Sequence, residues 1–542
     1  MPNSVAILGG GVAGLSAAHE LAERGYKVDV YERKPVLGGK ARSIPVPNSA
    51  APPQRPLPGE HGFRFFPGFY RHVTDTMRRI PYGAHGSTYD NLSVATRMLL
   101  ARAGKTEITW LARCPSDLEE FRVFLIELLT PFGVPVDEVS FFVSRILIVA
   151  TSCPERRLNE YEHITWWDFI AADRMSAAYR AYLGQGMTRS LVAMRAEESS
   201  TRTVGTTQLQ LLTGLMSPDR VFDRLLAGPT NDVWIDPWIV CLESLGVTFH
   251  RGARVSAIHV DRHRVSGATL ESAQGQLEIT ADYYIAALPV EVMAALMTDE
   301  LKAAAPSLAG LDKLKTRWMN GIQFYLSEDQ PLVHGHVLYA DSPWALTSIS
   351  QRQFWTNVDL SKFGDGTVRG ILSVDISDWD APGVLYGKPA HACSAEEIKE
   401  EVWTQLKQHL NDSGASPIDD ASLIAWFLDP DIEFPNPGSA TNAEPLMINT
   451  IGSLQHRPDA QVELENCFVA SDYVRTYTDI ACMEAANEAA RRAVNCLLAV
   501  SGSTSSPAQL WPLEEPAFLQ PLQEIDRIRF RLGLPHHLAF IR

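Results

Sequence analysis

The chain has 542 residues, 45% of them hydrophobic and 21% charged, which excludes wholesale disorder and supplies enough apolar chain for a large core. The 48 Lys and Arg residues against 64 Asp and Glu give a net charge of −16, so the chain lacks the electrostatic basis for binding a nucleic-acid backbone. Seven cysteines, an odd number without a Cys-x-x-Cys pair, argue against a disulfide framework and predict thiols in a reducing, cytoplasmic setting.

The N-terminus predicts a first strand and not a targeting segment. MPNSVAILGGG has no basic region, and its apolar run continues directly into glycines. The most apolar stretch elsewhere, residues 141–150 (FFVSRILIVA), has an internal Arg145 and is far shorter than the ~20 residues of a membrane span. We therefore expect a buried or interfacial helix there.

The chain alternates between segments of two kinds. In chain order, we predict a strand–helix–strand unit (4–32), a proline-rich loop (45–59), a helical and aromatic-rich region (76–215), strands (246–294), mixed helix and strand (300–445), a strand with a helix from about Met483 (464–499), and a linker from residue 501.

The N-terminal unit carries a dinucleotide-binding motif. Gly9-Gly-Gly11-Val12-Ala13-Gly14 is a G-x-G-x-x-G sequence between a predicted strand and a predicted helix. Its glycines permit a tight turn and a close backbone approach to a pyrophosphate, and the helix N-terminus offers free N–H groups. Glu32, at the end of the second strand, is placed to accept hydrogen bonds from an adenosine ribose.

Two further segments favour FAD over NAD, a choice that the first motif leaves open. Leu37-Gly-Gly39-Lys40-Ala-Arg42 holds a second glycine pair with basic side chains suited to a pyrophosphate. Near the C-terminus, Asp472 ends a predicted strand and Met483 opens a predicted helix. An acid at a strand end and a helix N-terminus suit the ribityl chain and the electron-rich edge of a flavin.

Five segments occur in an order that is shared with a known family. They are ILGGGVAGLSAAHELAERGYKVDVYER, LGGKARS, GEHGFRFFPGFYRHV, ADYYIAALPV and CFVASDYVRTYTDIACMEAANEAARRAVN. With them the chain resembles the FAD-dependent amine oxidase/phytoene desaturase superfamily, and residues 62–70 (GFRFFPGFY) are most similar to its phytoene desaturase and squalene-modifying branch.

The resemblance implies an α/β fold with interleaved domains. A Rossmann-type FAD-binding domain would comprise residues 1–75, 220–300 and 450–500, an α+β substrate-binding domain residues 76–219 and 301–449, and a C-terminal extension residues 501–542.

The resemblance also implies which residues bind the cofactor. They are Gly9, Gly11, Val12, Ala13, Gly14, Glu32, Arg33, Gly39, Lys40, Arg42, Val255, Asp472 and Met483. Two positions depart from the family pattern: Ser471 replaces the glycine of Ala-Gly-Asp, and Lys40 replaces an arginine. The lysine loses bidentate phosphate geometry but keeps the charge.

The two branches of the superfamily require different substrate sites. By resemblance, the amine oxidase branch has a lysine on a substrate-domain strand, where we expect Asn320 in this chain. The desaturase-like branch requires an apolar lining that excludes water. We expect the tryptophans of the middle segments, Trp110 to Trp355, to supply that lining or to belong to the core.

Three polar residues are the candidate catalytic groups. Arg64, Tyr70 and Tyr477 are expected beside the flavin ring, with Arg64 either anchoring a polar group or forming a salt bridge with Glu60. His61 is a weaker candidate for a base. His334-Gly-His336 has no evident third ligand, so we expect no metal.

These observations lead to a preferred function with alternatives. The preferred one is an FAD-dependent oxidoreductase that desaturates or otherwise oxidises a lipophilic, isoprenoid-like substrate by hydride transfer to flavin N5. The main alternative is an FAD-dependent oxidase or dehydrogenase of an amine or another small polar metabolite. A non-catalytic escort protein and a flavin-dependent isomerase or hydratase stay open.

The C-terminal tail predicts a short basic amphipathic helix. Its apolar residues recur every three to four positions from Leu519 to Leu532, with Arg527, Arg529 and Arg531 between them. Such a helix either lies on a membrane surface, or docks on the protein itself or on a second subunit of a homo-oligomer.

Overall fold

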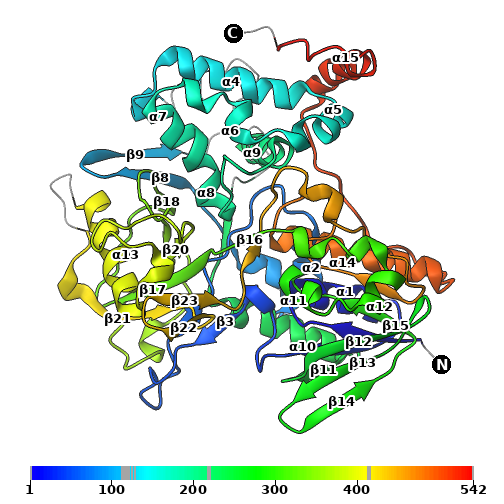
Figure 1. Ribbon diagram of the computed structural model, residues 1–542. Coiled ribbons are helices and arrows are strands. Elements are labelled where there is room, and N and C mark those ends of the chain that lie inside the picture. Colours follow the sequence, from blue (N-terminus) through cyan, green and yellow to red (C-terminus); the bar gives the residue numbers. More distant parts are fainter. Residues whose placement is uncertain are drawn as a thin grey trace.

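Two β-sheets, one parallel and one mixed, lie on either side of the central region of the molecule, and a group of helices lies beyond them (Figure 1). The computed structural model describes residues 3–111, 123, 126, 130–215, 221, 223–411 and 417–539. The parallel sheet is built from strands near both ends and the middle of the sequence, and the mixed sheet from the segments between them.

The parallel sheet has five strands in the order β11-β2-β1-β15-β25. Their bounds are β1 (Ser4–Leu8), β2 (Lys27–Glu32), β11 (Thr248–Arg251), β15 (Tyr283–Ala286) and β25 (Cys467–Val469). Val5 is in register with Val28 on one side and with Tyr283 on the other. Numbered along the chain, the order is 3-2-1-4-5, the arrangement of a dinucleotide-binding fold.

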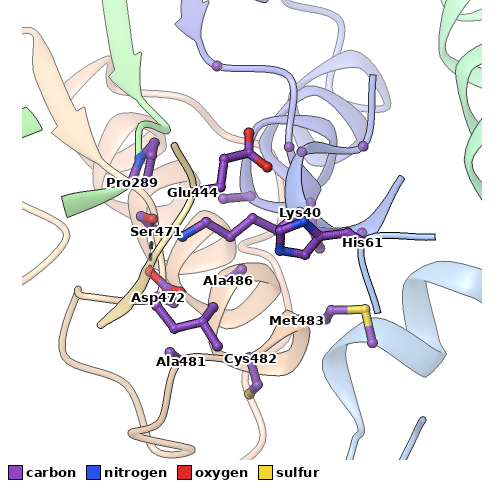
Figure 2. A pocket seen from close by; sticks show the side chains of 18 of the residues that line it. Lys40, His61, Pro289, Glu444, Ser471, Asp472, Ala481, Cys482, Met483 and Ala486 are labelled. Atoms are coloured by element: carbon purple, nitrogen blue, oxygen red, sulfur yellow. Dashed lines mark hydrogen bonds between the residues drawn. The ribbon is translucent and has the colours of Figure 1, made fainter. Parts of the chain in front are cut away.

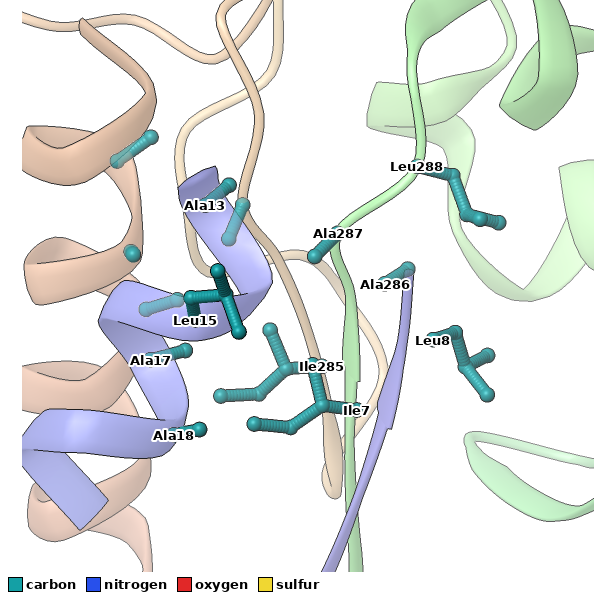
Figure 3. Close-up of a cluster of buried hydrophobic side chains, with 14 of the residues drawn as sticks. Ile7, Leu8, Ala13, Leu15, Ala17, Ala18, Ile285, Ala286, Ala287 and Leu288 are labelled. Carbon is teal, nitrogen blue, oxygen red and sulfur yellow. The ribbon is translucent and has the colours of Figure 1, made fainter. Parts of the chain in front are cut away.

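Helix α1 (Val12–Ala22) covers one face of this sheet together with α14 (Met483–Val500). Figure 3 shows Leu15 and Ala17 of α1 facing Ile7 and Ile285, whereas Leu8 points to the opposite side of the sheet. Both faces are buried, as the unbroken apolar sequence of β1 requires in a parallel sheet. The helix that we predicted from Met483 is therefore part of this core.

Further elements surround the parallel sheet. They are α2 (His72–Arg79), α10 (Asp236–Ser244), α11 (Val290–Ala295), α12 (Asp299–Ala304), and an antiparallel sheet of β12 (Arg254–Asp261), β13 (Arg264–Ser272) and β14 (Gly275–Ile279).

The mixed sheet has seven strands in the order β21-β17-β20-β19-β18-β8-β9. They are β8 (Arg97–Arg102), β9 (Lys105–Leu111), β17 (Asn320–Leu326), β18 (Gly335–Tyr339), β19 (Thr347–Ser350), β20 (Gly370–Ile376) and β21 (Leu423–Leu428). Every residue of β17 and β20 is buried, and α13 (Ala395–Leu410) packs Ile398, Val402 and Leu406 into the cluster that holds Ile322 and Phe324. The centre of the sheet is thus buried, and it includes polar side chains such as Gln323, which donates to the Ser373 hydroxyl at 2.9 Å.

The helical region contains α4 (Val136–Thr151), α5 (Pro154–Asn159), α6 (Trp166–Phe169), α7 (Ala177–Tyr179), α8 (Met187–Val192) and α9 (Thr201–Leu215), with α15 (Gln520–Arg531) against α4 and α5. The apolar stretch 141–150 lies in α4, where Phe142, Val143 and Ile146 are buried, as the sequence predicted. Among the helices that the structure describes, none has the length and apolar character to cross a bilayer.

Short paired strands complete the fold. The pairs are β3 (Ser43–Pro45) with β4 (Pro58–Glu60), β5 (Pro81–Tyr82) with β6 (Gly86–Ser87), β7 (Leu92–Val94) with β10 (Arg224–Leu226), β16 (Thr316–Arg317) with β24 (Leu446–Met447), and β22 (Ile432–Asn436) with β23 (Ser439–Asn442). The segment predicted as a proline-rich loop is therefore closed at both ends by the β3–β4 pair.

Replacing Gly14 by alanine tests the packing of α1 on the sheet. An added Cβ would lie 1.9 Å from the carbonyl oxygen of Gly9, so the helix or the turn must shift. We expect Gly14→Ala to lower the free energy of unfolding by about 1–3 kcal/mol, the usual range for overpacking. Thermal unfolding followed by circular dichroism measures this loss, and an unchanged midpoint would contradict the close approach.

Candidate functional site

A cavity lined by residues of both the parallel and the mixed sheet contains the candidate site. It begins at the carboxyl ends of β1 and β15, where the strand order of the parallel sheet reverses. Gly9 follows β1 with a φ of 110°, and an added Cβ would lie 2.4 Å from the carbonyl oxygen of Ala287, which follows β15. Glycine is the residue that permits both this conformation and this approach. Ligands of open α/β sheets bind in the crevice at such a point.

Two glycine turns meet across this crevice. The Gly38 N–H donates to the carbonyl oxygen of Gly10 at 2.9 Å, and an added Cβ on Gly39 would lie 2.9 Å from the Cα of Gly11. Helix α1 begins at Val12, and no side chain caps its first turn. Its free N–H groups and the positive end of its dipole are thus available to an anion such as a pyrophosphate.

Glu32 is fixed at the end of β2 with its carboxylate beside the first glycine turn. Oε2 accepts a hydrogen bond from the Gly10 N–H at 2.8 Å, and Oε1 accepts one from the Lys34 N–H at 2.9 Å. The side chain is buried but lines the cavity together with Tyr31 and Val255. These contacts hold the carboxylate in place and leave it lone pairs for a ribose hydroxyl.

The opposite wall comes from the C-terminal part of the chain. Ser471 follows β25 and donates to the Asp472 carboxylate at 3.2 Å, and the Lys40 side chain extends toward this pair (Figure 2). Met483 opens α14, with Cys482 as the residue before it. Groups from the two ends of the sequence therefore face one another across the same space.

Most of the predicted cofactor-binding residues line this cavity. They are Gly9, Gly11, Val12, Ala13, Glu32, Arg33, Gly39, Lys40, Val255, Asp472 and Met483.

Two predicted residues, Gly14 and Arg42, do not line the cavity but contact residues that do. Gly14 lets α1 pack against the Gly9 turn. Arg42 turns away from the cavity, donating to the carboxylate of Glu444 at 2.8 Å and pairing with Asp431. It also donates to the carbonyl oxygen of Gly39 at 2.7 Å, so it steadies the second glycine turn and does not itself face the cavity.

The rest of the cavity is mostly apolar. Its lining includes Phe63, Phe65, Pro67, Phe69, Leu211, Met319, Leu446 and Ile480. None of the tryptophan side chains that the structure describes lies in this lining. Trp166, Trp234, Trp238, Trp344 and Trp355 are buried core residues instead, and phenylalanines provide the apolar wall.

Arg64 and Asp375 are charged residues within this apolar lining. Arg64 donates to the carbonyl oxygens of Gly62 at 2.8 Å and of Lys40, and not to Glu60, whose carboxylate accepts hydrogen bonds from Ser43 and Thr230. Asp375 was not predicted as a site residue. The one signal in the sequence was a lone acid in the otherwise uncharged stretch GILSVDI.

Burial dominates the electrostatics of Asp375. It raises the pKa of the carboxyl to about 7, although the neighbouring Arg64 and His61 act in the opposite direction. Oδ1 is buried and has no hydrogen-bond partner in the part of the chain that the structure describes. A carboxyl group with a pKa near neutrality and a free oxygen is suited to accept or release a proton.

His61 also lines the cavity, but its ring is paired with an acid behind it. Nδ1 lies 2.6 Å from Oδ2 of Asp429, and the amide of Asn320 donates to the same oxygen at 2.6 Å. Asn320, expected at the position of the amine oxidase lysine, is fully buried in this network and does not line the cavity. His61 and Asn320 are therefore positioned by the acid behind them.

His61, Asp429 and Asp431 offer ligand atoms within 4.8 Å of one another, a spacing that suits a metal ion. Arg42 and Lys34, however, both form ion pairs with Asp431. The protein's own cations therefore already neutralise this acidic cluster.

The two candidate tyrosines lie in different places. Tyr70 is buried in the cavity wall and hydrogen-bonds with Cys482, and burial raises the pKa of the Cys482 thiol to about 12. Tyr477 does not line the cavity: its side chain is 43% exposed, and the Arg492 guanidinium lies 4.4 Å from the ring centre. We expected Tyr477 beside the flavin ring, and the structure places it at the surface.

Two family patterns match the sequence. Residues 7–80 match the NAD(P)-binding Rossmann-like domain, and residues 154–498 match the flavin containing amine oxidoreductase family. The second match covers more than half of the chain.

Single proteins show more limited likeness. Carotenoid phi-ring synthase of Streptomyces griseus is 54% identical over 43 residues, 8% of this chain and 8% of the relative. Zeta-carotene desaturase of Zea mays is 54% identical over 40 residues, 7% of each chain, so both alignments span less than a tenth of the relative. A solved structure of putrescine oxidase with bound putrescine has a TM-score of 0.61 at 14% identity, over 92% of this chain and 99% of that one, which shows a shared fold.

The cofactor is FAD, and the residues present fit it. The uncapped N-terminus of α1 and the Lys40 ammonium suit the pyrophosphate, and Glu32 suits the adenosine ribose. Asp472 and the start of α14 suit the ribityl chain and the flavin.

Glu32→Ala tests the cofactor end of the cavity. Loss of the charge-assisted hydrogen bond should weaken FAD binding by about 1.5–3 kcal/mol, a roughly 10- to 150-fold rise in Kd, measured by titration of the apoprotein. Asp29→Ala is the matched control, because Asp29 lies on the same strand and pairs with His250 outside the cavity. An unchanged Kd in Glu32→Ala would show that the carboxylate does not contact the cofactor.

Proposed function

We propose, from the premise that this chain belongs to the flavin-containing amine oxidoreductase family, that it oxidises a lipophilic, isoprenoid-like substrate, with desaturation as the reaction. The observation that carries the proposal is the phenylalanine-rich wall of the cavity beyond the cofactor-binding residues. Two of the short likenesses, to carotenoid phi-ring synthase and zeta-carotene desaturase, are to proteins named for such substrates, while segments of similar length also match subunits of a formate dehydrogenase and a heterodisulfide reductase, so the cavity wall carries the proposal.

An apolar wall favours such a substrate for energetic reasons. Each buried methylene of a hydrocarbon chain contributes roughly 0.8 kcal/mol to binding, whereas a polar group placed against these rings would lose its hydrogen bonds to water. Phe63, Phe65 and Phe69 come from one segment, and Leu211 of α9 and Ile480 belong to others. The wall can thus hold a chain and exclude water at the same time.

The protein's own groups orient the reaction, and bound FAD supplies the two-electron acceptor that takes up a hydride. Tyr70 and Cys482 stay protonated at neutral pH because burial raises the pKa of both groups. They are neutral hydrogen-bonding groups that shape the wall. Asp375 is the one carboxyl of the apolar part that can change its protonation state near neutrality.

A second candidate, an amine, is favoured by one observation. Asp375 provides a buried carboxylate that an ammonium group could pair with, and the fold is shared with putrescine oxidase. Against it, the positively charged Arg64 guanidinium, which would repel an ammonium group, lies close to that carboxylate. We therefore place the amine second.

Anaerobic mixing of the FAD-loaded protein with candidate substrates separates the two. We expect acyclic triterpene or tetraterpene hydrocarbons in detergent micelles to bleach the flavin absorbance, with a product that has lost two hydrogens by mass spectrometry, and putrescine and cyclohexylamine to leave it unchanged. Leu211→Asn should raise KM for the hydrocarbon about tenfold or more, because a polar amide then faces the chain. Leu245→Asn, at a 40% exposed site outside the cavity, is the control. Bleaching by the amines alone would overturn the proposal.

A further inference from the structure

We propose that Asp375 is the catalytic base of this enzyme and accepts, at Oδ1, the proton that the substrate carbon loses. This inference rests on the proposed function and names the residue that completes it.

The position of Asp375 depends on two glycines that face it. In register, Asp375 of β20 lies between Gly321 of β17 and Thr347 of β19. An added Cβ on Gly62 would lie 2.6 Å from Oδ1 of Asp375, and one on Gly321 would lie 2.7 Å from the Cα of Gly62. Because neither residue has a side chain, the segment around Gly62 lies directly on the sheet, and the carboxyl reaches the cavity lining.

The free oxygen of this carboxyl calls for a partner that the protein does not supply. Asp375 is 5% exposed, and its Oδ1 has no hydrogen-bond partner among the residues that the structure describes. Leaving a buried carboxyl oxygen unpaired costs about 1–3 kcal/mol, so native structures rarely retain such an atom without a function. Its place in the cavity lining makes a bound substrate the natural partner.

The charges around Asp375 come from two elements. Arg64 and His61 lie on the segment that crosses the sheet, and His336 of β18, itself paired with Asp223, lies against Phe63 of that segment. Together they favour the carboxylate, while burial favours the neutral acid and prevails, which places the pKa at about 7. At neutral pH the group therefore exists in both forms and can take up a proton and later release it.

In the proposed step, a proton and a hydride leave two neighbouring carbons of the substrate. The bond between a substrate carbon and its hydrogen breaks, the proton goes to Oδ1 of Asp375, and the electron pair left behind forms the new double bond. The adjacent carbon gives up a hydride to oxidised FAD, so the substrate loses two electrons and the cofactor gains them. Asp375 then returns its proton to solvent before the next turnover.

Asp375→Asn is the first test, with Asp378→Asn as its control. Asp378 is a buried acid three residues along the chain that pairs with Arg189 and Arg195 and lies outside this cavity. We expect Asp375→Asn to lower kcat for the hydrocarbon about 100-fold or more, with KM and FAD affinity kept, and the control to react as the wild type does. A normal kcat in Asp375→Asn would overturn the proposal.

The wild-type protein provides a second test that does not need the variant to fold. Because the carboxylate is the active form, kcat should rise with pH through about 7 and then level off, and a flat profile from about pH 6 to 8 would contradict the base. Infrared spectroscopy should show a carboxylic acid band that disappears over the same range and is missing in Asp375→Asn. If an amine is the substrate and Asp375→Asn raises KM with kcat kept, both the proposed function and the base are wrong.

A separate observation concerns the C-terminal helix, and we infer that its outer face binds the surface of an anionic lipid bilayer. Helix α15 docks through the face that carries Asp526, with the half-buried Leu522 and Phe530 beside it. Asp526 is fully buried, accepting hydrogen bonds from the side chain of Arg156 at 2.9 Å and from the Cys153 N–H at 2.9 Å. This ion pair fixes the rotation of the helix.

The rotation leaves the apolar side of the helix outward. Ile525, Ile528 and Leu532 are 47%, 55% and 68% exposed, and Phe518 and Leu534 beside them are 51% and 42% exposed. An amphipathic helix docked on a protein core normally turns these residues inward. The reversed orientation presents an apolar strip at the outer edge of the molecule, beyond α4 and α5 (Figure 1).

The charges near this strip match an anionic lipid surface. Within the residues that the structure describes, the Arg529 side chain donates to the carbonyl oxygen of Pro535, and Arg531 is exposed in the last turn. Glu524 on the outer side of the helix is paired with Arg527, so Arg529 and Arg531 leave a local positive charge beside the exposed isoleucines and leucine, in a chain with a net charge of −16. Apolar insertion combined with attraction to headgroups is the binding mode of interfacial helices.

Vesicle sedimentation tests this inference independently of catalysis. The FAD-loaded wild type should sediment with vesicles of phosphatidylcholine and phosphatidylserine, less with phosphatidylcholine alone, and the double variant I528D/L532D should lose most of this binding. L277D, at a 53% exposed site on β14, is the control and should bind as the wild type does. Absence of wild-type binding would overturn the inference. So would a dimer, by light scattering, that I528D/L532D dissociates, because a second copy would then cover the strip.

Discussion

Glycine residues let backbone segments approach one another closely, and these contacts hold the two sheets around one cavity. The turn after β1 meets the turn at Gly38 and Gly39, and the segment at Gly62 lies directly on β17. The first contact shapes the pyrophosphate end of the cavity, and the second brings the mixed sheet close enough for Asp375 to line it. A methyl group at either contact would separate the elements that must meet for the cofactor and the substrate to share a space.

Buried ion pairs act beside these contacts and join distant parts of the chain. Arg42, near the N-terminus, is paired with Asp431 and Glu444, and the neighbouring cations hold the pKa of Glu444 well below its usual range even though burial alone raises it. Such pairs add little net stability because both charges lose water, but removing one partner is costly. Their effect here is to fix how the second glycine turn and the 429–446 segment lie together.

The sequence predicted the cofactor end of the site well because its signals are local. The glycine motif, Glu32 after the second strand, and the helix at Met483 each depend on a few neighbouring residues, and all lie where they were expected. The substrate end could not be read in the same way. Asp375, Asp429 and Glu444 acquire their environment from residues more than a hundred positions away, so no local pattern identifies them.

The sequence did not decide where the aromatic side chains would lie. For the tryptophans the lining and the core were both open, and the structure places Trp166, Trp234, Trp238, Trp344 and Trp355 in the core, while the cavity wall comes from the phenylalanines after Gly62. Tyr477 lies near the cofactor segments in the sequence, but its backbone N–H donates to Glu488 and its ring lies against Arg492. Proximity along the chain did not predict on which side of α14 the ring would lie.

The alternation of the two sheets along the chain has a consequence for biosynthesis. The ribosome makes the first glycine turn at residues 9–14 almost at the start and the facing wall at residues 471–483 near the end. A nascent chain therefore carries half of its nucleotide crevice, open to water, until residues 471–483 have emerged. FAD therefore binds late in the synthesis of the chain. Chains that end before residue 471 would lack one wall of the crevice and would not show the yellow colour of bound FAD.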